Sequence, residues 1–136
     1  MYFYIIKSGG TIILTKRGTG GIWSSLYHFP MLESDQEHPK EEIADKLTTM
    51  VLSQLTSGVH ESGGGLGGAA LIHLEKISEP IRHQLSHLTI HARFIHLELT
   101  PLPLSLPAQY LYISLENLPE FPVPRLMERY MEVAKF

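Results

Sequence analysis

The 136-residue sequence contains no cysteine. Without thiols, the chain cannot form a disulfide, hold zinc through thiolates or bind an iron–sulfur cluster with its own side chains. Long apolar stretches are lacking too, because no run approaches the roughly 20 residues that a membrane-spanning helix needs. The opening residues, MYFYIIKSGG, have no basic stretch before their short apolar run, so they do not form a signal peptide.

Positive charge is also scarce. The chain has 11 Lys and Arg against 14 Asp and Glu, a formal net charge of −3 with histidine neutral. Proteins that hold nucleic acid mainly through its phosphates are usually basic. If DNA is a partner, most of the contact with its backbone should therefore come from outside this chain.

The first half of the chain predicts a β-hairpin followed by a helix. Aromatic and β-branched residues fill 2–7 and 11–17, and Ser8-Gly9-Gly10 separates the two runs. Pro39 and the acidic residues after it are typical of a helix start. The predicted helix has one apolar face, formed by Ile43, Leu47, Met50, Val51 and Leu55.

The second half predicts further strands and a closing helix. We expect strands over 69–77, 83–87, 88–99 and 109–114, one helical turn from Ser114, and a helix over 125–134. This order of elements favours a mixed or antiparallel sheet with helices on its faces, of the α+β or three-layer α/β/α class. A chain of this length forms one domain with one core.

Three patterns suggest sites that their residues do not support. The run Gly63–Gly68 (GGGLGG) lacks the Gly-Lys-Ser/Thr of a phosphate-binding loop and is predicted to be a linker. A regular strand would place His83, His87 and His91 on one face and His96 on the other. No carboxylates lie near them at the spacing of metal ligands, so we expect no metal site. Ser86 and His87 are adjacent and point apart, which disfavours a nucleophile–base pair.

Four large apolar residues, Trp23, Leu26, Tyr27 and Phe29, crowd a short loop. They could form a platform on which bases stack. Apolar loop residues of a small domain more often pack against the edge of the core, and a packed loop would also shape a site beside it. Both interpretations stay open at this point.

Several short motifs occur in a particular order along the chain. They are Arg17, Gly21-Ile22-Trp23, Leu26-Tyr27-His28-Phe29-Pro30, Leu85-Ser86-His87 and Pro124-Arg125-Leu126-Met127. In this order they resemble the C-terminal domain of MutY-type adenine DNA glycosylases, over nearly the whole chain. Two positions depart from the family pattern: His28, where the family often carries Glu, and Gly18, where many relatives carry Pro.

The resemblance implies a Nudix-like fold, a mixed sheet flanked by helices. The catalytic Nudix box, G-x5-E-x7-R-E-U-x-E-E-x-G-U, is missing, because Glu41 and Glu42 are followed by no Arg-Glu-x-x-Glu-Glu. Residues 1–136 would then form a single lesion-recognition domain, a C-terminal fragment of a longer glycosylase. It would hold no catalytic residue, metal or cofactor, since the catalytic carboxylates and the iron–sulfur cluster of the parent enzyme belong to its N-terminal domain.

The implied function is recognition of 8-oxoguanine opposite adenine in base-excision repair. In this lesion N7 carries a proton and C8 carries an oxygen, so a serine hydroxyl can accept from N7–H while a donor faces O8. By resemblance Ser86 makes these contacts, Leu85 wedges beside the lesion, and His87 orders the bend or contacts a phosphate. Further candidates for contacting DNA or shaping the loop are Arg17, Trp23, Tyr27 and His83.

The implied partners are double-stranded DNA with an 8-oxoguanine:adenine mispair and the N-terminal catalytic domain of the same protein, in the bacterial cytoplasm near the nucleoid and away from membranes. Two alternatives remain open. One is a divergent Nudix hydrolase acting on a nucleotide diphosphate. The other is an interaction module that contacts a clamp or repair partner through the proline-rich segment Pro101–Pro107.

Overall fold

The computed structural model describes residues 1–16, 23, 25–34, 36–55, 71–100 and 106–134. Arg17, the glycine run at 63–68 and the prolines at 101 and 103 lie outside the described residues. Predictions that concern them are therefore not addressed by the fold.

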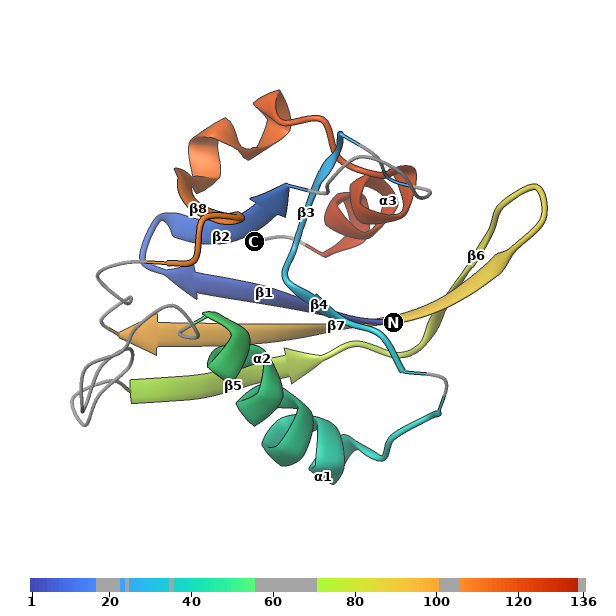
Figure 1. The fold of residues 1–136 in the computed structure, drawn as a ribbon, viewed down its shortest axis with the longest axis horizontal. Helices are drawn as coiled ribbons and strands as arrows, with labels where there is room; N and C mark the ends of the chain where they lie inside the picture. The colour runs from blue at the N-terminus through green and yellow to red at the C-terminus, as the bar shows by residue number, and fades with distance from the viewer. Residues whose placement is uncertain (17–22, 24, 35, 56–70, 101–105, 135–136) are drawn as a thin grey trace.

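The described strands form one mixed sheet of eight (Figure 1). Strand β1 lies at its centre, antiparallel to β2 and β4 and parallel to β7, while β5 and β6 pair with β7. The strands are β1 (Tyr2–Ser8), β2 (Thr11–Lys16), β3 (Tyr27–His28), β4 (Met31–Leu32), β5 (Leu71–Ile77), β6 (Ile81–Gln84), β7 (Thr89–Thr100) and β8 (Tyr110–Ser114). The predicted first hairpin is confirmed, and its turn uses Gly9 at φ +60°.

Helices cover both faces of the sheet, so the α/β/α alternative is the correct one. One face carries α1 (Lys40–Glu42), the π-helical turn η1 (Ile43–Leu47) and α2 (Thr48–Leu55), which follow one another without a break. The other face carries α3 (Arg125–Val133), which follows the 3₁₀ helix η2 (Leu115–Glu120). The predicted cap is confirmed, because Ser114 Oγ accepts a hydrogen bond from Glu116 N.

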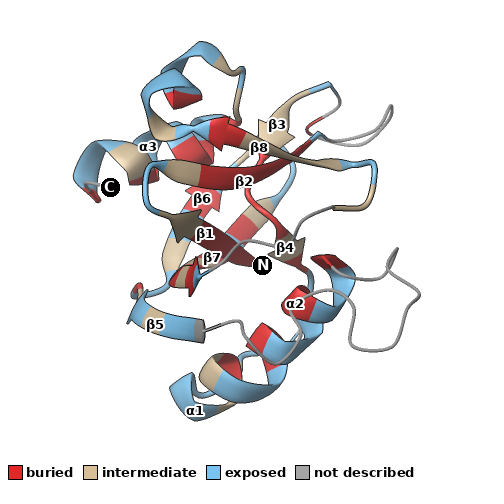
Figure 2. Ribbon diagram, turned by 90° about the vertical axis from the view of Figure 1, so that its left-hand side faces the viewer, coloured by how far each residue is buried: buried red, intermediate tan, exposed pale blue. Residues whose placement is uncertain are grey.

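The sheet separates two apolar clusters, which appear as buried residues in Figure 2. Phe3 and Phe94 meet α3, where Tyr130 stacks on Phe94 with ring centroids 3.9 Å apart. Tyr4 and Ile95 belong to the cluster on the opposite face, beneath the helices of residues 40–55. Successive residues of β1 and of the inner part of β7 therefore alternate between the two clusters.

One predicted core residue of the first helix is wrong. Met50 is 47% exposed, and Leu52 is buried instead. The π-helical turn at 43–47 explains the difference, because its wider turns rotate the following residues relative to a regular α-helix. Thr48 N, for example, donates to Ile43 O, five residues earlier.

Strands β6 and β7 form a hairpin that projects beyond the sheet (Figure 1). Residues 93–100 of β7 lie within the sheet, whereas 89–92 pair with β6. His83 pairs with Ile90, so it shares the face of Ile90 and His96, while His91 lies on the opposite face with Arg82. The prediction that His83 and His91 share a face is therefore wrong. It counted alternating residues along one continuous strand, whereas the two residues lie on different strands, and the turn between those strands sets which residues pair.

Candidate nucleic-acid interface

The turn at the end of this hairpin consists of Leu85, Ser86, His87 and Leu88, which we call the tip. Its ends are joined by a backbone hydrogen bond of 2.7 Å from Leu85 N to Leu88 O. Just outside, Thr89 Oγ1 donates to Gln84 Oε1 at 2.8 Å, and Gln84 Nε2 donates to Leu85 O at 3.0 Å. The turn is thus closed without using the side chains of Ser86 and His87.

The side chains of Ser86 and His87 are exposed and form no hydrogen bond with other described residues. Of the two roles that the resemblance implied for His87, ordering of the bend through its imidazole is not seen among those residues. Both side chains at the outermost point of the hairpin are therefore available to a ligand.

The inner face of the hairpin packs against the α3 side of the core. Ile90 and Ala92 are buried there, and Ile81 is half-buried against them. His83 is 7% exposed, and its Nδ1 lies 3.4 Å from Arg129 Nη1 of α3. His83 thus joins the hairpin to α3.

The two leucines of the tip occupy different environments. Leu85, the predicted wedge, is half-buried and packs against the core cluster. Leu88 is 47% exposed and was not singled out from the sequence. Both lie beside Ser86 and His87, but only Leu85 packs against the core cluster.

Trp23 and Tyr27 pack against the body of the domain. Trp23 is 5% exposed, and its ring lies 5.8 Å from that of Phe3, so it belongs to the core. Tyr27 is half-buried, edge-on to Phe121 with ring centroids 5.0 Å apart. These contacts favour packing over base stacking, since a stacking platform needs an accessible ring face.

Two further histidines are structural. His28 is 5% exposed, and its Nδ1–H donates to Phe29 O at 2.7 Å. His96 is also buried, and its Nε2 lies 2.6 Å from the hydroxyl of Tyr130. Burial lowers the pKa of His96 to about 4, with smaller contributions from Lys7 and Lys76.

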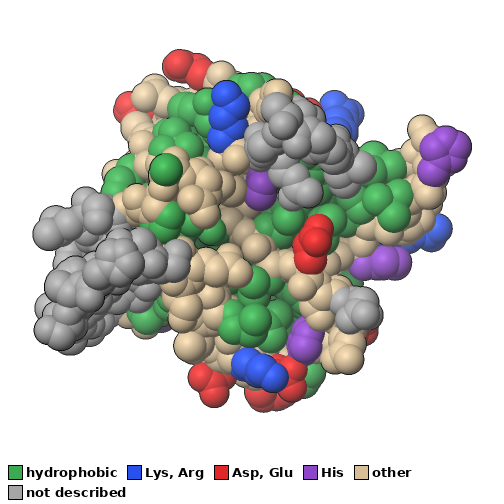
Figure 3. All heavy atoms as spheres, viewed as in Figure 1, with side chains coloured by type: hydrophobic (Ala, Val, Ile, Leu, Met, Phe, Trp, Pro, Cys, Tyr) green, Lys and Arg blue, Asp and Glu red, His purple; other side chains and the backbone are tan. Residues whose placement is uncertain are grey.

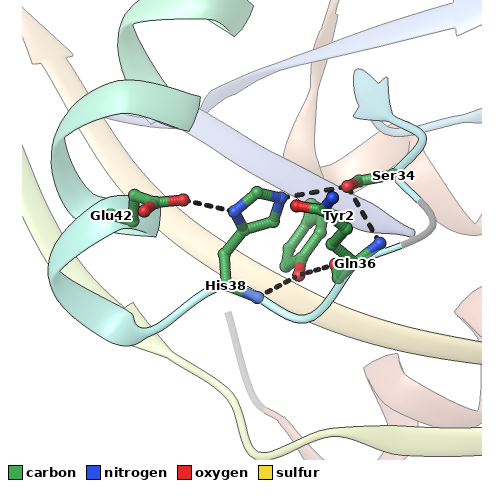
Figure 4. Close-up of polar contacts among 5 residues, drawn as sticks. All are labelled: Tyr2, Ser34, Gln36, His38 and Glu42. Atoms are coloured by element: carbon green, nitrogen blue, oxygen red, sulfur yellow. Dashed lines mark hydrogen bonds and ion pairs between the residues drawn. The ribbon is translucent and has the colours of Figure 1, made fainter.

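A polar cluster holds the loop before α1 against β1 (Figure 4). The hydroxyl of Tyr2 donates to Gln36 O at 3.2 Å and accepts from His38 N at 3.1 Å. The His38 ring lies between Ser34 Oγ, at 2.9 Å from its Nε2, and the carboxylate of Glu42, beside its Nδ1. These contacts fix one wall of a groove of about 390 Å³ whose other wall is β7.

Comparison with known proteins identifies the family. Residues 1–133 match the family model of the NUDIX domain. The chain belongs to the Nudix family. The predicted Nudix-like mixed sheet flanked by helices is thereby confirmed. No match was found among curated protein sequences.

Solved structures that share this fold include the following three. The C-terminal domain of mouse MUTYH, solved with human PCNA, has a TM-score of 0.67 at 16% identity, covering 96% of this chain and 83% of that chain. The Nudix hydrolase RenU from M. smegmatis has a TM-score of 0.56 at 11% identity, covering 97% and 86%. The ORF135 protein of E. coli has a TM-score of 0.51 at 14% identity, covering 98% and 90%. Identities this low show the fold alone.

Within the described residues, no group of three or more His, Asp or Glu side chains is placed to hold a metal ion. In the same parts of the chain, every helix is too short or too polar to span a bilayer.

Proposed function

We propose that this Nudix domain recognises 8-oxoguanine in DNA as the C-terminal domain of a MutY-type adenine glycosylase. One observation carries the proposal: the exposed Ser86, with no hydrogen-bond partner among the described residues, stands at the tip of a hairpin anchored in the core. Recognition by a single polar group requires that the group be accessible and held in place. Structural similarity to the mouse MUTYH domain supports the proposal.

The chemistry of the lesion matches what Ser86 offers. Its hydroxyl can accept a hydrogen bond from N7–H of 8-oxoguanine, and its backbone N–H or hydroxyl can donate to O8. The hydroxyl can contact both N7–H and O8 of the lesion, whereas on guanine it can only donate to N7, because C8 of guanine carries no oxygen. The tip thus favours the lesion over the undamaged base.

In this proposal the chain carries no catalytic group of its own. The parent glycosylase would flip the mispaired adenine into an N-terminal domain with the catalytic carboxylates and the iron–sulfur cluster. This domain would meanwhile hold the opposite strand. Its partners would then be DNA with an 8-oxoguanine:adenine mispair and that catalytic domain.

Binding selectivity tests the proposal directly. The dissociation constant of the chain should be lower for a duplex with 8-oxoguanine opposite adenine than for one with guanine opposite adenine. Ser86→Ala should reduce this discrimination by about 1–3 kcal/mol, because one contact to the base edge is lost. The loss should be partial, since the backbone N–H of residue 86 survives.

The matched control is Ser53→Ala, an exposed serine of α2. It should leave the ratio of the two dissociation constants unchanged. Equal ratios for the wild type and Ser86→Ala would show that recognition lies elsewhere in the domain.

A second candidate function is hydrolysis of a nucleotide diphosphate, because the family match and the similarity to RenU fit it as well. The sequence argues against it: Glu41, Glu42 and Asp45 lie in the first helical turns, without the carboxylates of the Nudix box behind them. We expect no turnover of nucleoside triphosphates or of 8-oxo-dGTP by the chain with Mg²⁺. Phosphate release that depends on both protein and Mg²⁺ would establish the hydrolase instead.

A clamp is a further candidate partner, since the mouse MUTYH domain was solved in complex with human PCNA. The segment Pro101–Pro107 was the predicted contact, but residues 101–105 lie outside the described part of the chain. A pulldown with a clamp protein, before and after replacement of 101–107, would test this partner.

A further inference from the structure

The hairpin has a charge opposite to that of the whole chain. Residues 81–94 contain two Arg and three His but no Asp or Glu, in a chain of net charge −3. None of the ion pairs among the described residues involves a residue of this segment. In Figure 3 the visible side of the projecting arm shows histidine and basic side chains and no acidic one. The hairpin is thus a local cationic surface without internal counterions.

Strand pairing places Arg82 and His91 on the outer face of the hairpin, while His83 lies on the buried face. Arg82 and His91 are direct cross-strand partners, and both are exposed. The side chains of such a pair lie about 5 Å apart at Cβ, close enough to contact one phosphate or two successive ones. The next pair on the same face, Gln84 and Thr89, is also polar. The opposite face is buried, so the outer face alone is free for a ligand.

The groove of about 390 Å³ continues this face toward the sheet. Its β7 wall includes Thr89, His91 and Arg93. Arg93 Nη1 donates to Ser78 O at 3.3 Å, which leaves further N–H groups of its guanidinium for other acceptors. The opposite wall carries Glu37, so an anion in the groove is favoured along the β7 wall and repelled from the other.

From this arrangement we propose that the outer face of the hairpin binds the sugar–phosphate backbone of the lesion-bearing DNA strand. Arg82 and His91 contact phosphates, and Arg93 contacts a further phosphate of the same strand in the groove. A guanidinium presents paired N–H donors that match phosphate oxygens, and an imidazole donates an N–H in either protonation state. The inference rests on the proposed function and adds the residues that hold the strand while Ser86 contacts the base.

The salt dependence of binding separates phosphate contacts from base contacts. Dissociation constants of the chain for the 8-oxoguanine:adenine and guanine:adenine duplexes are measured by fluorescence anisotropy across a salt series. For the double variant R82Q/H91Q, the slope of log Kd against log salt should fall by about one to two units. Binding at low salt should weaken by about threefold to tenfold on both duplexes, with their ratio kept. Ser86→Ala should do the reverse, reducing the ratio and keeping the slope.

The matched control is Lys46→Gln, which removes one exposed positive charge from η1. It should leave the slope unchanged, and thermal melts of all variants should coincide with that of the wild type. The inference is overturned if R82Q/H91Q has the slope of the wild type, or if Lys46→Gln reduces the slope as much as R82Q/H91Q does. In either case a preference for the lesion duplex would still support the proposed function. A reduced slope without any lesion preference supports the phosphate contacts and refutes the proposed function. Absence of DNA binding refutes both.

Discussion

At the scale of single residues, the two leucines of the tip have the same side chain but differ in how exposed it is. Leu88 is 47% exposed and Leu85 is half-buried against the core. If the tip contacts the lesion as proposed, an exposed apolar side chain beside Ser86 is positioned to insert next to a base, as apolar wedges do in DNA-binding proteins. Leu88 is therefore the stronger candidate for the wedge that was predicted at Leu85.

The pair Leu88→Ala and Leu85→Ala tests this assignment. Leu88→Ala should weaken binding to the lesion duplex and change the free energy of unfolding by less than about 0.5 kcal/mol, as at other exposed positions. Leu85→Ala should cost about 1–2 kcal/mol of stability, because part of its side chain is buried. Urea unfolding and duplex titration measure both effects. Weaker binding in Leu85→Ala alone, at unchanged stability, would restore Leu85 as the wedge.

At the scale of elements, the β1–β2 hairpin depends on its two-residue turn. Gly9 has a φ of +60°, in the left-handed region that side chains with a Cβ rarely adopt, whereas Gly10 does not. Space is not the constraint, since a Cβ at either position would meet no atom within 4 Å. Backbone conformation alone therefore distinguishes the two glycines.

Gly9→Ala should destabilise the domain by about 1 kcal/mol, and Gly10→Ala should be neutral or slightly stabilising. Because β1 is the central strand, the loss should appear in the global unfolding transition. Chemical denaturation of the two variants measures it. Equal stabilities would mean that the turn tolerates Ala at position 9 by changing its conformation.

At the scale of the whole molecule, the buried pair of His96 and Tyr130 links stability to pH. The pKa of His96 is lowered to about 4 in the folded state, against an ordinary value of 6.5. Between these values the unfolded chain binds a proton that the folded chain does not, so unfolding becomes easier as the pH falls. The stabilisation is fully present above about pH 6.5 and is lost progressively toward pH 4.

We expect the free energy of unfolding to fall by roughly 1–3 kcal/mol over this range through His96. Denaturation curves at a series of pH values measure the change. The variant His96→Gln should be less stable at neutral pH, and its stability should depend less on pH below 6.5. The same pH dependence in both proteins would place the titrating group elsewhere.

The sequence by itself predicted most of the elements and a mixed sheet flanked by helices, but it missed the short strands β3 and β4, extended the strand before the tip to residue 87, and left α+β and α/β/α open. The first hairpin, the helix after Pro39, the strands around residue 86 and the closing helix all follow from local periodicity and turn residues. These signals act over a few neighbours and so can be recognised in one chain. The order of short motifs likewise pointed to the Nudix-like fold that the family match confirms.

Tertiary structure alone decided which side chains face outward. The π-helical turn moved Met50 to the surface and Leu52 into the core. Pairing across the tip put His83 against α3, brought Arg82 beside His91 and exposed Leu88 rather than Leu85. A one-residue difference in register or helical phase reverses the direction of a side chain, and contacts between distant segments set that register. The sequence therefore located the candidate site, and packing selected the residues within it that a ligand can reach.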